Sequence, residues 1–175
     1  MNAPVTLTMP ATIGAAMRQF AGRDALAFVG QRPETYAELA AGIDAVGALL
    51  QRAGIGPGGK VAILGHNMPN WAKAYFGTTF LGAIVVPLLP DFHPNEIDNI
   101  LRHAEPRALF VSASLEHRLK EVDTSLLELI VRLDDFQVIH APAPGIAFDP
   151  AARPAPTVHE VAEDDLAAII YTSGT

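Results

Sequence analysis

The sequence has 175 residues, of which 50% are hydrophobic and 18% are charged, so the chain can bury a core within one domain. The 12 Lys and Arg residues are outnumbered by 19 Asp and Glu residues, and the formal net charge of -7 disfavours a broad basic surface for nucleic acid. Because the sequence contains no cysteine, disulfides, thiolate metal sites and a cysteine nucleophile are excluded.

The beginning of the chain carries no basic segment followed by an unbroken apolar run, so it does not have the pattern of a secretory signal. The most apolar stretch, Phe80 to Leu89, is much shorter than the roughly 20 residues that a membrane-spanning helix needs. We therefore expect a cytoplasmic protein without a membrane span.

The first third of the chain is expected to alternate between helix and strand. Apolar residues at helical spacing from Ile13 to Phe20 predict a helix, and the run from Ala25 to Val29 predicts a short strand. Thr35 and Glu38 have the spacing of a capping box, and the apolar residues that follow them predict a helix that ends at Gly54.

The rest of the chain continues this alternation. Helices are predicted to begin at Pro69, Pro94 and Ser114. Short apolar runs between and after them predict strands at residues 60–65, 84–88, 107–112, 129–133 and 166–171, the last of which has the composition of a central strand. Residues 140–157 are rich in proline and alanine and are predicted to form a loop. We therefore predict an α/β fold, with a mainly parallel, doubly wound sheet flanked by helices.

One glycine pattern imitates a nucleotide-binding motif. Gly54, Gly56 and Gly59 have the spacing of a dinucleotide fingerprint. That fingerprint follows a strand and opens a helix, whereas these glycines follow a predicted helix and precede a strand. We interpret them as a structural turn, with Gly54 at the end of the helix.

The last residues form a different kind of candidate site. Thr172, Ser173, Gly174 and Thr175 follow the apolar run LAAIIY and combine hydroxyl groups with a glycine. Glycine lets backbone N–H groups turn toward an anion, and the hydroxyls can donate further hydrogen bonds. By itself the pattern is also typical of a plain turn.

Three segments of the chain resemble motifs of one known family, and they occur along the chain in the same order as in that family. LAAIIYTSGT is similar to the start of the phosphate-loop signature of the AMP-forming acyl-adenylating superfamily, ETYAEL at residues 34–39 resembles its early Tyr-x-Glu-Leu motif, and FLGAIVVPLLP at residues 80–90 resembles its second core motif. Residues 87–112 look more like acyl-CoA ligases, including long-chain ones, than like peptide-synthetase domains. The chain is thereby identified as the N-terminal part of the large AMP-binding domain of an acyl-CoA ligase.

The resemblance implies a two-step reaction. A carboxylate attacks the α-phosphorus of ATP to give an acyl-adenylate and pyrophosphate, and the thiol of CoA then attacks the acyl carbon, with Mg²⁺ offsetting the phosphate charge. Thr172, Ser173, Gly174 and Thr175 would bind the β- and γ-phosphates. The substrates implied are a fatty or other carboxylic acid, ATP and CoA. Neither a catalytic residue nor a metal ligand is assigned within these residues.

The resemblance also implies that residues 1–175 lack the rest of the phosphate loop with its lysine, and the C-terminal domain. We expect this fragment alone to be inactive and to bind no cofactor. A stand-alone α/β scaffold or binding protein without adenylation activity remains an alternative. The acyl chain length, and the choice between fatty, aromatic and short acids, stay open. Because Leu166 to Tyr171 would present an open strand edge, we expect a homo-oligomer through this segment.

Overall fold

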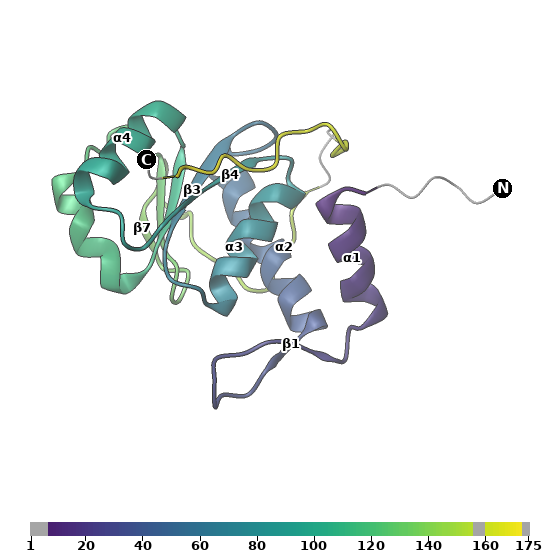
Figure 1. Cartoon of the computed structure of the whole chain (residues 1–175). Coiled ribbons are helices and arrows are strands. Elements are labelled where there is room, and N and C mark those ends of the chain that lie inside the picture. Colours follow the sequence, from purple (N-terminus) through teal and green to yellow (C-terminus); the bar gives the residue numbers. More distant parts are fainter. Residues whose placement is uncertain (1–6, 156–159, 173–175) are drawn as a thin grey trace.

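The computed structural model describes residues 7–155 and 160–172, in which the apolar runs lie side by side in a five-stranded sheet (Figure 1). The strands lie in the order β4-β3-β5-β6-β7. The first four are parallel and consist of β3 (Lys60–Leu64), β4 (Ile84–Leu88), β5 (Ala108–Val111) and β6 (Leu129–Arg132). The predicted mainly parallel sheet flanked by helices is confirmed.

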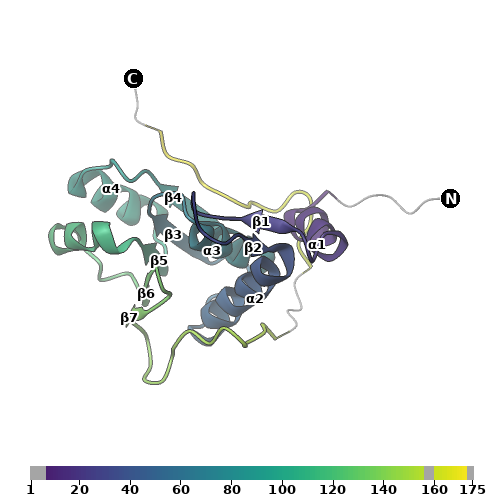
Figure 2. The same cartoon turned by 90° about the horizontal axis from the view of Figure 1, so that it is seen from below.

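Both faces of this sheet are buried, and they are covered by different helices (Figures 1 and 2). The helices α2 (Tyr36–Arg52) and α3 (Pro69–Phe80) cover one face, where their apolar side chains pack against Val61, Ile63 and Phe110. The helix α4 (Pro94–Ala104) and the 3₁₀ helix η1 (Ala113–Glu121) cover the other face, against Ala62 and Leu64. Adjacent strand residues thus alternate between two apolar layers, which explains the continuous apolar runs.

The remaining elements lie outside these layers. Helix α1 (Met9–Gln19) packs through Met17 on α2. The strands β1 (Asp24–Leu26) and β2 (Glu34–Thr35) form a small antiparallel hairpin, which lies below α2 and α3 in Figure 1. The capping box predicted at Thr35 and Glu38 is present: Thr35 N donates to Glu38 Oε2 (2.8 Å) and Glu38 N donates to Thr35 Oγ1 (3.2 Å).

Strand order creates a switch point at the carboxyl edge of the sheet. The chain leaves β3 for β4 on one side through α3 and then returns through α4 to β5 on the other side of β3. In open parallel sheets, ligands bind where successive connections diverge in this way. Loops after β3, β5 and β6 therefore mark the edge at which a site is expected.

The prediction of a central strand at residues 166–171 is wrong, because this segment does not form a regular strand. A single parallel bridge joins Ala168 to Val85, and the segment lies on the outer side of β4, at the edge of the sheet. Val85 N donates to Ala167 O (3.0 Å), and Ile169 N donates to Val85 O (2.9 Å). The direction is parallel, as predicted, but only one residue is fully paired. Composition alone gave no information about which strands would stand on either side.

Three smaller differences concern local structure. The helix predicted from Ser114 is a 3₁₀ helix that begins at Ala113. An unpredicted strand, β7 (Val138–His140), pairs antiparallel with β6, so His140 belongs to a strand, whereas residues 141–155 contain neither helix nor strand. Gly54 follows the C-cap residue of α2 with a φ of 75°, and a strand comes after it, which agrees with a structural turn.

Candidate functional site

Only the first residue of the predicted phosphate-binding loop falls within the described structure. Thr172 is exposed and directly follows the segment bound to β4, whereas Ser173, Gly174 and Thr175 lie outside the described residues. The assignment of these four residues to phosphate binding therefore stays a prediction. Within residues 7–155 and 160–172, no group of three or more His, Asp or Glu side chains could hold a metal ion.

Tyr171, the residue before Thr172, contacts helix α4. Its hydroxyl lies 2.6 Å from His103 Nδ1 on α4, and the two rings meet edge to face with centroids 5.7 Å apart. Partial burial raises the pKa of the Tyr171 phenol above its usual value, so the hydroxyl keeps its proton at neutral pH. Tyr171 is therefore held against α4, in the apolar layer that this helix covers.

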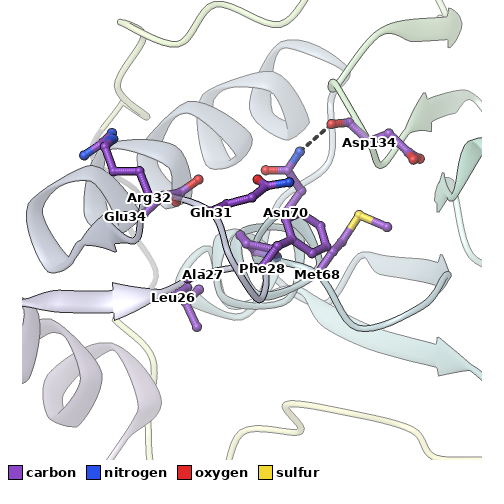
Figure 3. Close-up of a pocket in the computed structure, with 10 residues that line it drawn as sticks. Leu26, Ala27, Phe28, Gln31, Arg32, Glu34, Met68, Asn70 and Asp134 are labelled. Carbon is purple, nitrogen blue, oxygen red and sulfur yellow. Dashed lines mark hydrogen bonds between the residues drawn. The ribbon is translucent and has the colours of Figure 1, made fainter.

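A second candidate site is a cavity of about 310 Å³ at the carboxyl edge of the sheet (Figure 3). It lies between the β1–β2 hairpin and the loops that follow β3 and β6. One part of its lining is apolar and consists of Leu26, Ala27, Phe28, Met68 and Pro69. The other part is polar and consists of Gln31, Arg32, Glu34, Asn70 and Asp134. An apolar part beside a few polar side chains is the composition typical of a ligand-binding pocket.

A partly buried network of hydrogen bonds lies at one wall of this cavity. Lys73 Nζ lies 2.8 Å from Glu34 Oε1 and 3.2 Å from Asn70 Oδ1, and the Lys73 side chain is only 12% exposed. Asn70 Nδ2 donates to the backbone oxygens of Leu133 and Asp134, at 2.9 Å each, and the bond to Asp134 is drawn in Figure 3. The network joins the hairpin, α3 and the end of β6.

Close packing of α2 against α3 brings the ammonium group of Lys73 into this position. A Cβ atom at Gly42 on α2 would lie 2.6 Å from Cδ of Lys73, so only glycine leaves room for the aliphatic part of the lysine side chain. The second carboxylate oxygen, Glu34 Oε2, is buried without a hydrogen-bond partner among the described residues. The ion pair with Lys73 therefore helps to offset the cost of partly burying this carboxylate.

A second ion pair, between exposed side chains, lies at the hairpin wall of the cavity. Arg32 Nη2 lies 2.7 Å from Glu38 Oε1, and Figure 3 shows Arg32 pointing away from Glu34. The hydrogen bond from Arg32, together with that from the Thr35 backbone, lowers the pKa of Glu38 to about 2. Glu38 therefore stays ionised and caps α2 across the physiological pH range.

The sequence did not predict the cavity, the Lys73 network or the His103–Tyr171 contact. Lys73 and Glu34 are 39 positions apart, and His103 and Tyr171 are 68 apart, so no local periodicity connects them. One signal was present: a lysine one helical turn after Asn70 on an otherwise apolar helix face. The partners across the fold could not be identified without the strand order.

Comparison with known proteins gives one family. Residues 14–175 match the profile of the family described as AMP-binding enzyme. The 3-hydroxybenzoate/4-hydroxybenzoate–CoA ligase of Thauera aromatica is 32% identical over 171 residues, which cover 93% of this chain and 32% of that protein. The long-chain fatty acid–CoA ligase of Thermus thermophilus is 29% identical over 143 residues, 81% of this chain and 26% of that protein.

A solved structure supports the fold. The crystal structure of the anthranilate CoA ligase AuaEII in complex with anthranoyl-AMP superposes with a TM-score of 0.80 and 21% identity, covering 98% of this chain and 32% of that one. The chain thus spans between about a quarter and a third of the length of these proteins. In the part of the chain that the structure describes, no helix is long and apolar enough to cross a membrane. Since the family profile covers nearly all of its sequence, the chain belongs to the AMP-binding enzyme family.

Proposed function

We propose that the protein carrying this segment is an ATP-dependent acid–thiol ligase, which activates a carboxylic acid as an acyl-adenylate and transfers the acyl group to CoA. The observation that carries the proposal is the family match over residues 14–175, which includes the hydroxyl-rich sequence that begins at Thr172. Thr172 immediately follows the segment that is joined to β4 by one parallel bridge. A loop at this position could present backbone N–H groups to phosphate.

The residues of this chain would contribute to ATP binding rather than to the chemical step. The hydroxyls of Thr172, Ser173 and Thr175, with the backbone at Gly174, would donate hydrogen bonds to the β- and γ-phosphates. Bound Mg²⁺ would offset the charge on these phosphates.

The acyl substrate is proposed as a fatty acid, with an aromatic acid as the second candidate. Residues 87–112 resemble acyl-CoA ligases of the long-chain type, and a relative named as a long-chain fatty acid–CoA ligase matches 81% of this chain. The hydroxybenzoate–CoA ligase, which matches 93% of this chain, favours the aromatic alternative. We also propose a cytoplasmic location, which cell fractionation can test.

Pyrophosphate release by the full-length gene product would test the proposed function. ATP, Mg²⁺ and CoA are supplied with a long-chain fatty acid or with 3-hydroxybenzoate, and acyl-CoA formation is followed by chromatography. We expect acid-dependent pyrophosphate release and a matching amount of acyl-CoA. Pyrophosphate release without thioester would point to a different acceptor, and the lack of both with every acid would refute the proposal.

The 175-residue chain by itself is proposed to be inactive and to bind Mg²⁺-ATP weakly, because most of the length of its relatives lies outside it. Calorimetry with Mg²⁺-ATP and an assay for acyl-adenylate would check both statements. A micromolar dissociation constant, or adenylate formed by the isolated chain, would contradict them.

We further propose that the isolated chain self-associates through residues 166–171. Leu166 and Ile170 are 57% and 73% exposed beside the outer edge of β4, where a second chain could pair. Light scattering after size exclusion should show a dimer or larger oligomer that Ile170→Lys disrupts. A monomer at high micromolar concentration, unchanged by the substitution, would contradict this proposal.

A further inference from the structure

Two neighbouring hollows lie between the β1–β2 hairpin and the start of α3. The first has a volume of about 310 Å³ and is the cavity of Figure 3, and the second has a volume of about 370 Å³. Each volume lies in the range of about 300–1,000 Å³ that is usual for small-molecule sites. The residues that line both hollows are Leu26, Ala27, Phe28, Met68 and Pro69. The hollows are therefore two lobes of one cavity with a shared apolar boundary.

The second lobe has an aromatic wall. Trp71 on α3 lines this lobe, and its indole stacks on the ring of Tyr75 with centroids 5.2 Å apart and an angle of 21° between the planes. Phe28 on the hairpin borders both lobes and is 46% exposed. The stack orients the indole, and a ring placed against Phe28 would bury apolar surface that is now exposed. This lobe therefore suits a flat apolar group.

The charged side chains that line the first lobe are engaged within the protein. Arg32 Nη2 lies 2.7 Å from Glu38 Oε1, and Glu34 Oε1 lies 2.8 Å from Lys73 Nζ. Asp134 Oδ2 accepts a hydrogen bond of 2.7 Å from the backbone N–H of the first residue of η1. A charged ligand would compete with these interactions and would also lose its own hydration. An uncharged ligand leaves the ion pairs intact, so the first lobe favours a neutral molecule.

Two amide side chains supply uncharged polar groups at this lobe. Figure 3 shows Gln31 extending from the hairpin toward Asn70 on α3. The Asn70 amide is oriented by two hydrogen bonds of 2.9 Å from Nδ2 to backbone oxygens, and its Oδ1 accepts from Lys73 at 3.2 Å and has a second lone pair. The Gln31 amide adds two N–H donors and one acceptor oxygen. Donors and acceptors side by side match the edge of another amide.

We propose that this cavity is a binding site for an uncharged aromatic molecule with a hydrogen-bonding edge, such as an aromatic carboxamide. The ring would lie in the lobe lined by Phe28 and Trp71, and the amide edge would lie beside Gln31 and Asn70. The site goes beyond the proposed function, because the carboxylic acid, ATP and CoA of that reaction all carry negative charge. The inference therefore does not depend on ligase activity.

Three matched probes test the charge and the shape of the site. Benzamide is uncharged at pH 7, benzoate is negative and benzamidine is positive, and the three molecules have nearly the same size. Trp71 is the single tryptophan of the chain, so the indole N–H signal in nitrogen–proton NMR spectra reports on the second lobe. We expect benzamide to shift this signal with a dissociation constant of about 1 mM, which is reasonable for so small a ligand. Benzoate and benzamidine should bind at least about tenfold more weakly.

Two substitutions, each with a matched control, locate the site. Phe28→Ala removes an aromatic wall and should weaken benzamide binding about fivefold or more, whereas Val29→Ala, at the neighbouring fully exposed position, should have no effect. Gln31→Glu places a carboxylate at the amide wall and should reverse the preference, so that benzamidine binds more tightly than benzamide. Gln19→Glu, the same change at the exposed end of α1, should leave benzamide preferred.

Four results would overturn the proposal: a Trp71 signal that benzamide does not shift, tighter binding of either ion than of benzamide, equal losses in Phe28→Ala and Val29→Ala, or an unchanged preference in Gln31→Glu. Tighter binding of benzoate would instead favour the cavity as a site for a carboxylic acid. If the full-length gene product released no pyrophosphate, the proposed ligase function would fall, and the probe experiment would still decide the cavity.

Discussion

Strand β3 and the segment from Leu166 to Tyr171 have almost the same apolar composition and opposite positions in the molecule. All residues from Val61 to Leu64 are 0% exposed, with a parallel partner on each side and a helical layer on each face. The segment 166–171 has one bridge to β4, and Ile170 is 73% exposed. An apolar run therefore indicates that a strand can be buried, but the neighbouring strands decide whether it is.

The largest expected effect on stability comes from replacing an isoleucine by alanine in β3, compared with the same replacement in the segment 166–171. Ile63→Ala should destabilise the chain by about 2–5 kcal/mol, because it leaves a cavity between β3 and the helices. Ile170→Ala should change stability by about 0.5 kcal/mol or less, as is usual for an exposed side chain. Urea unfolding followed by circular dichroism measures both. Equal losses would mean that the segment is as well packed as the central strand.

The next prediction concerns the helical layer that covers β3. A Cβ atom at Gly77 on α3 would lie 2.7 Å from Val46 Cγ1 and 3.0 Å from the backbone oxygen of Ile43 on α2. Gly77→Ala should cost about 1–3 kcal/mol through overpacking, despite the better helix propensity of alanine. Gly22→Ala is the control, because a Cβ there meets nothing within 4 Å. A Gly77→Ala chain as stable as wild type would show that the two helices can separate without loss.

A third prediction tests how the carboxyl edge of the sheet is anchored. Lys73→Met leaves the carboxylate of Glu34 without its ammonium partner and should destabilise the chain by about 1–3 kcal/mol. Lys73→Met combined with Glu34→Gln should recover part of this loss, because the uncompensated charge is gone. Lys120→Met, at an exposed lysine on η1, should have little effect. Thermal unfolding of the four chains would check the ordering, which a double variant weaker than Lys73→Met would contradict.

The smallest expected effect is a pH dependence at the exposed end of α2. Hydrogen bonds from Arg32 and Thr35 lower the pKa of Glu38 to about 2 in the folded chain, below the usual value of about 4.3. The carboxylate therefore stabilises the fold above the pKa of the unfolded chain, and this contribution is lost as the pH falls toward about 2. Glu38→Gln should flatten the decline in urea midpoint between about pH 5 and about pH 2. Glu121→Gln is the control, and identical declines in both variants would speak against this account.

Local sequence signals predicted the helices and strands well where contacts between nearby residues determine the bounds of the element. The cap at Thr35 needs only Glu38, three residues away, so α2 was predicted with its start and its end before Gly54. Residues 84–88 were predicted as a strand and are β4 with the same bounds. In contrast, the Lys73 network needs residues from β2, α3 and the end of β6, which come together only after the sheet has formed.

The sequence alone determined the α/β class, the parallel direction of the strands and the family resemblance, because apolar runs, caps and motifs are local properties of the chain. The tertiary structure decided the strand order, the edge position of residues 166–171, the cavity at the switch point and the bond between His103 and Tyr171. The physical reason is that burial and hydrogen-bond pairing depend on which segments become neighbours. Two runs as similar as KVAIL and LAAII can therefore end at the centre and at the edge of the same sheet.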